Sequence, residues 1–112
     1  MIETLVMNYL EEKMTPVPVY LEYPEENLTK FIVIEKMGSS ESNQIQRATI
    51  AVRSHGKTLG EAMELNESVK DAMKDMVELD AVSRVTRNSD YNFTDAERHE
   101  YRYQALFDIT YY

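Results

Sequence analysis

The residues best suited to chemistry in this sequence lie in ERHEYR, residues 97–102. Glu97 and Glu100 flank His99, and a histidine between two carboxylates could serve as a general acid or base. The same grouping is typical of a charged strand entrance that keeps a sheet edge soluble. The other histidine, His55, falls in a predicted loop before a long helix, and neither histidine has metal-ligand spacing such as H-x-x-x-H. We therefore interpret both as solvated or turn histidines.

Other reactive patterns are weaker. The chain has no cysteine, which excludes disulfides, thiolate metal sites and cysteine nucleophiles. Its three glycines make no phosphate-binding loop, and no serine lies in a nucleophile elbow. Carboxylates on the predicted long helix could collect Mg²⁺ or Ca²⁺, but Lys70 and Lys74 lie among them and indicate ion pairs on a solvated face: Glu64, Glu67, Asp71, Asp75 and Glu78. We expect no enzyme activity, no cofactor and no metal site.

Length and charge narrow the class of protein. The 112 residues correspond to one domain, residues 1–112. The formal charge of −8 argues against sequence-independent binding to a phosphate backbone or to an anionic membrane surface. No apolar run is long enough to span a bilayer, and the first fourteen residues lack a basic start and a cleavage site. We expect a cytosolic product and no membrane partner.

Hydrophobic periodicity predicts an α+β fold with the order α-β-β-β-α-β-β. A short N-terminal helix ends at Thr15-Pro16. The long helix covers residues 59–79, with Thr58 and Glu61 as a capping box and Met63, Met73 and Met76 as core residues. Strands are predicted at 17–23, 30–37, 44–54, 82–87 (extending less clearly to 93) and from 101 to the end, with a flexible polar connection over 38–43. They form a mainly antiparallel sheet of four or five strands, with the long helix packed on one face.

The last strand, YRYQALFDITYY, has apolar residues on both sides. Tyr101, Tyr103, Ala105, Phe107, Ile109 and Tyr111 share one face, while Leu106 and Tyr112 fall on the other. Five of the chain's eight tyrosines lie between Tyr91 and Tyr112. Tyrosine is enriched at protein interfaces, so this segment suggests contacts between chains, although some of these tyrosines could simply line the sheet.

The segment FIVIEKMGSSESNQIQRATIAVRSHGKTLGEAMELNESVKDAMKDM, residues 31–76, resembles the small tail-completion proteins of long-tailed bacteriophages and prophages, also called tail terminators or head–tail joining proteins. The closing segment VSRVTRNSDYNFTDAERHEYRYQALFDITYY is similar to their final hairpin. The resemblance implies a ring, usually a hexamer, that stops growth of the tail tube. Its partners would be the major tail (tube) protein and the head–tail connector, with DNA passing through the lumen without specific binding. It further implies a virion protein at the tail–head junction, located in the host cytoplasm during assembly, with no catalysis.

The candidate interface residues combine the aromatic segment with arginines of the third strand and the polar connection. They are Tyr91, Phe93, Tyr101, Tyr103, Tyr111, Tyr112, Arg47, Arg53, Ser39, Ser40 and Glu41. Two other classes stay open. One is a small bacterial α+β protein-binding or regulatory module that uses the sheet face, and the other is a small enzyme that uses Glu97, His99 and Glu100.

Overall fold

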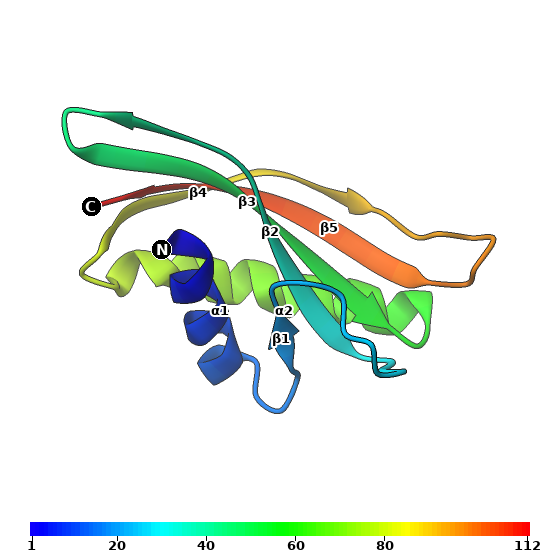
Figure 1. Cartoon of the computed structure of the whole chain (residues 1–112). Helices are drawn as coiled ribbons and strands as arrows, with labels where there is room; N and C mark the ends of the chain where they lie inside the picture. The colour runs from blue at the N-terminus through cyan, green and yellow to red at the C-terminus, as the bar shows by residue number, and fades with distance from the viewer.

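A five-stranded sheet with the strand order β1-β2-β3-β5-β4 forms the frame of the computed structural model, which describes all of residues 1–112 (Figure 1). The strands are β1 (Val19–Tyr20), β2 (Phe31–Ser42), β3 (Ile45–Gly56), β4 (Val82–Asn92) and β5 (Tyr101–Tyr111). All neighbouring pairs are antiparallel except β1 and β2, which are parallel. The predicted α+β class is confirmed.

The central strands β3 and β5 show the expected alternation. Ala48, Ile50 and Val52 are buried on the inner face of β3, where Ile50 pairs with Phe107 of β5. Ala105 and Ile109 are buried beside Phe107. The inner face of the sheet therefore forms one wall of a single hydrophobic core.

The other wall is made by two helices, α1 (Ile2–Lys13) and α2 (Leu59–Asp75), the latter continued by the 3₁₀ turn η1 (Met76–Glu78). Thr58 caps α2, since its Oγ1 accepts a hydrogen bond of 3.1 Å from the Glu61 amide, but the reciprocal half of the predicted capping box does not form. Met73 and Met76 are fully buried as predicted. Met63 is not, because its position on the helix turns it to solvent and leaves it 46% exposed.

A tyrosine side chain joins the shorter helix α1 to α2 by a hydrogen bond. Tyr9 lies on the buried side of α1, and its hydroxyl donates a 2.6 Å hydrogen bond to the Ala72 carbonyl oxygen. Burial, together with the carboxylates of Asp75, Glu78 and Glu12, raises the pKa of Tyr9. Neither helix is long and apolar enough to cross a membrane.

Two predictions about strands are wrong. The expected strand over 17–23 is reduced to Val19–Tyr20, which pairs in parallel with Ile32–Val33. The expected flexible connection over 38–43 is instead the far end of β2, since Ser39 pairs with Ala48 and Ser42 with Ile45. The strands turn at Asn43 and Gln44, whose φ angles of 51° and 66° are those of a two-residue type I′ hairpin.

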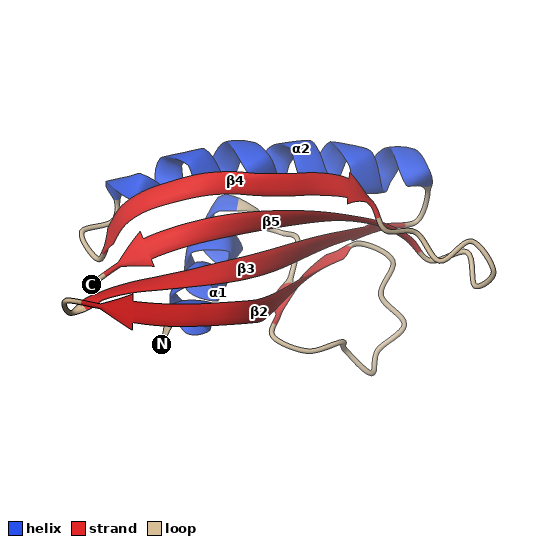
Figure 2. Ribbon diagram, turned by 90° about the horizontal axis from the view of Figure 1, so that it is seen from above, coloured by secondary structure: helices blue, strands red, loops and turns tan.

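The two faces of the sheet have different surroundings. Both helices cover the inner face, whereas no element covers the outer face, which Figure 2 shows from above with β4, β5, β3 and β2 side by side. We call this outer face the open face. Most of the side-chain hydrogen bonds between strands lie on this face.

Candidate functional site

The open face is organised by hydrogen bonds that cross several strands. The Asp108 carboxylate of β5 accepts from the Thr49 hydroxyl of β3 at 2.7 Å and from the Asn88 amide of β4 at 3.0 Å. These residues face outward because their neighbours in sequence, Ile50 and Phe107, face the core. The network joins three strands and gives the face a fixed polar centre.

A second network lies further along the open face around Arg53. Its guanidinium donates to Glu35 at 2.7 Å and to the Gln104 side-chain oxygen at 2.6 Å, and Gln104 in turn donates to the Tyr91 hydroxyl. Phe93 lies beneath two guanidinium groups, with Arg102 at 4.7 Å and Arg53 at 5.6 Å from the ring centre. Such cation–π contacts hold the arginines in place without neutralising their charge.

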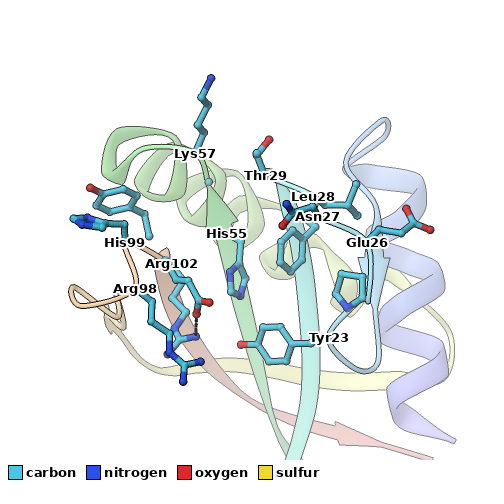
Figure 3. A pocket seen from close by; sticks show the side chains of 15 residues that line it. Tyr23, Glu26, Asn27, Leu28, Thr29, His55, Lys57, Arg98, His99 and Arg102 are labelled. Atoms are coloured by element: carbon cyan, nitrogen blue, oxygen red, sulfur yellow. Dashed lines mark hydrogen bonds and ion pairs between the residues drawn. The ribbon is translucent and has the colours of Figure 1, made fainter.

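A cavity of about 600 Å³ opens at the end of the sheet where β2 begins and β3 ends. Its walls come from the segment 23–31, from residues 55–57 and from the turn 98–102 (Figure 3). Tyr23, Phe31 and His55 supply an aromatic wall, and Arg98 and Lys57 lie at the rim. This volume is within the range of small-ligand pockets.

His55 lies at the centre of this cavity wall, and our expectation of a solvated loop histidine is wrong. β3 continues to Gly56, so His55 is a strand residue that is only 6% exposed. Its ring stacks on Phe31 with centroids 4.3 Å apart and contacts Tyr23 edge-on at 5.3 Å. Burial, reinforced by Arg102 and Arg53, lowers the pKa of His55 from 6.5 to about 4. The imidazole is therefore neutral near pH 7, and its Nε2 atom is buried without a hydrogen-bond partner.

His99 lies on the opposite wall in the turn between β4 and β5, exposed and with a φ of 55°. Glu100 is engaged by Arg102 at 3.3 Å, and the backbone of Asp95 bridges to Glu100 to close the turn. Glu97 is exposed and does not line the cavity. The three residues of the sequence cluster therefore form a turn and do not converge on one point. No group of three or more potential ligands lies close enough to hold a metal ion.

The predicted interface residues fall in three places. Arg53, Tyr91 and Phe93 meet on the open face. Tyr101 and Tyr103 are half-buried on strand β5 near the cavity end, with Tyr103 paired to the fully buried Ser54 on the inner side. The others gather at the far end of the sheet, which we call the arm end: Ser39, Ser40, Glu41, Arg47, Tyr111 and Tyr112. At that end, burial and the carboxylates of Glu3 and Glu41 raise the pKa of Tyr111.

Neither the cavity nor the positions of Arg84 and Arg102 on the open face are predicted from the sequence. Arg84 pairs with Thr110 of β5, whose other neighbour is Arg47 of β3, so both arginines lie on the open face near the arm end. The usable signal is the alternation of Ala51, Arg53 and His55, which continues one residue beyond the predicted strand end at residue 54.

No model of a known protein family matches the sequence, and no curated protein is similar to it.

Proposed function

We propose that this chain is a non-enzymatic assembly protein that associates with copies of itself into a ring. In its specific form the ring is a bacteriophage tail terminator that caps the tail tube and meets the head connector. This assignment to a tail rests on the likeness of the segments 31–76 and 82–112 to tail-completion proteins. The self-association rests on the surface of the fold.

The observation that carries self-association is that two edges of the sheet have unpaired backbone groups. β1 pairs with only two residues of β2, so β2 from Ile34 to Ser42 has a free edge, and β4 has a second free edge along its whole length. Free backbone donors and acceptors at sheet edges recruit other chains. The open face adds a broad polar surface beside them.

The arm end supports the same proposal. The hairpin tip from Ser39 to Gln44 is exposed throughout and, in Figure 1, lifts away from the helices. A two-stranded ribbon has little stability of its own in water. A neighbouring subunit would supply the surface that the chain itself does not provide.

The direct test is the mass of the assembled particle. Light scattering and negative-stain imaging of the purified protein should show a ring of several subunits, or a monomer–ring equilibrium that shifts with concentration. A tail terminator should also stop the growth of tubes formed by the tail protein whose gene lies beside its own. Rings that leave tube length unchanged would contradict the tail assignment and leave self-assembly standing.

One observation favours a second candidate function, a small protein-binding or regulatory module. The cavity around His55 is large enough for a side chain or a small ligand, and its histidine has an unpartnered buried nitrogen. A monomer that binds a host protein, with binding lost in Phe31→Ala, would support this candidate. Because the protein would be a monomer in that case, the same result would contradict the ring.

A further inference from the structure

The charges of this acidic chain are separated between its two faces. The charged side chains at outward positions of strands β2 to β5 sum to +2 within a chain of −8: Arg47, Arg53, Arg84, Arg102, Glu35 and Asp108. Residues 59–80, which include α2 and η1, carry seven carboxylates and two lysines, a formal charge of −5. Because the helices cover only the inner face, the basic and acidic surfaces point in opposite directions (Figures 1 and 2).

The basic side contains two arginines with no carboxylate partner. Arg47 and Arg84 are exposed on the open face, and neither forms an ion pair within the chain. Arg84 makes only a 3.2 Å hydrogen bond to the Thr86 hydroxyl. By contrast, the carboxylates nearest to Arg53 and Arg102 already pair with those arginines. The free positive charge therefore concentrates at the arm end of the open face.

The helix side likewise carries carboxylates without an ion-pair partner. Four carboxylates along the exposed side of α2 and η1 make no ion pair within the chain: Glu64, Asp71, Asp75 and Glu78. Lys70 is occupied by Glu67 at 2.8 Å and by Asp90 at 3.4 Å, and these contacts raise its pKa. We call the four carboxylates the acidic helix face.

We propose that the open face of one copy, with Arg47 and Arg84, docks onto the acidic helix face of the next copy. This inference rests on the proposed self-assembly and names its interface. The charge complementarity of the two faces is the argument for a second copy as occupant. A standard stable interface buries about 800 Å² of accessible surface on each partner, and the extents of the molecule, 45 × 25 × 24 Å, leave room for a contact of this size on its long face.

Such a contact links the copies head to tail. The two faces belong to different surfaces of the same chain, so the contact is heterologous and repeats from copy to copy. The series closes into the proposed ring if the rotation between copies divides a full turn without a rise along the axis, and otherwise it forms an open filament. Ion pairs at the rim of such an interface are weakened by salt, since the screening length falls from about 10 Å at 0.1 M to about 3 Å at 1 M.

The test uses two charge-reversal variants of the full chain. Variant one is Arg47→Glu with Arg84→Glu, and variant two is Asp71→Lys with Asp75→Lys. Each places like charges across the contact, and each should weaken self-association about a hundredfold in light scattering at 0.1 M salt. The matched control for variant one is Lys57→Glu with Arg98→Glu, which makes the same charge change at the cavity rim and should assemble like the unmodified chain. Unchanged circular dichroism of all variants shows that they fold.

Mixing the two variants sharpens the test. Each reversed face then meets the face of opposite charge on the other variant, so an equimolar mixture should assemble into alternating rings. If the unmodified chain forms rings but variant one assembles equally well, the proposed interface is wrong and self-assembly stands. If the unmodified chain is monomeric at 100 μM, both proposals fail. A monomer that binds a single-stranded oligonucleotide through Arg47 and Arg84 would assign the open face to nucleic acid instead.

Discussion

The burial of His55 predicts a specific dependence of stability on pH. The pKa of this imidazole falls from 6.5 in the unfolded chain to about 4 in the folded protein, first through burial and then through Arg102 and Arg53. Between these values the unfolded chain binds the proton more readily. The stabilisation from a neutral His55 is therefore complete above about pH 6.5 and is lost as the pH falls toward 4.

The size of the effect follows from the two pKa values. At pH 5.0 the shift corresponds to about 2 kcal/mol of lost unfolding free energy if the site were fully shielded. The imidazole borders an open cavity, so solvent screening reduces this to about 1 kcal/mol. Since carboxylates also titrate in this range, the prediction concerns the difference between the unmodified chain and a variant without the histidine.

The variant His55→Phe keeps the stack on Phe31 and removes the titration. Urea unfolding at pH 7.5 and 5.0, at concentrations where the chain is monomeric, should show that this variant gains about 1 kcal/mol relative to the unmodified chain as the pH falls. The control His99→Asn alters an exposed histidine in a left-handed conformation that asparagine tolerates, and it should keep the pH dependence of the unmodified chain. Stability curves that stay parallel between His55→Phe and the unmodified chain would refute the reasoning.

Three further substitutions or deletions test the fold. Thr58→Ala removes the cap of α2 and should lower the unfolding free energy by about 1 kcal/mol in urea titration, whereas no change would mean that the cap is not formed. Gly56→Ala places a Cβ atom 2.5 Å from the Ala62 amide nitrogen, so it should lower stability by about 1–3 kcal/mol; a neutral thermal melt would contradict this close approach. Deleting Phe107–Tyr112 removes paired residues between β3 and β4 and should abolish the cooperative melt, so a truncated chain that still melts cooperatively would overturn the strand pairing.

The parts of the fold that could be predicted are those where burial imposes a period on the sequence. The core covers only one face of the sheet, so buried residues alternate with outward ones along each strand. This alternation is visible in the sequence at Ile50, Val52 and Phe107. In α2 the same is true of the helical repeat and its cap at Thr58. Of the three methionines predicted in the core, Met73 and Met76 are buried because they face the sheet, whereas Met63 faces solvent.

The missed features have no such period. The end of β2 from Gly38 to Ser42 is exposed on both faces, so its composition is that of a loop, and only its pairing with β3 makes it a strand. β1 depends on a parallel pairing across a ten-residue segment, which local sequence does not encode. His55 was misplaced because its burial comes from Phe31 and Tyr23, which are distant in sequence.

The interface residues illustrate the same limit. Arg53, Tyr91 and Phe93 do share the open face, whereas Tyr101 and Tyr103 lie at the other end of β5 from Tyr111 and Tyr112. A list of aromatic residues cannot show which of them face the same way across strands. The register of β3, β5 and β4 determines it.

Self-association is the claim on which the account depends, and the molar mass in solution tests it most directly. Light scattering coupled to size exclusion at 0.1 M salt should give a mass that is a multiple of 13.1 kDa and that decreases at 1 M salt. A constant mass of 13.1 kDa across concentration and salt would contradict it.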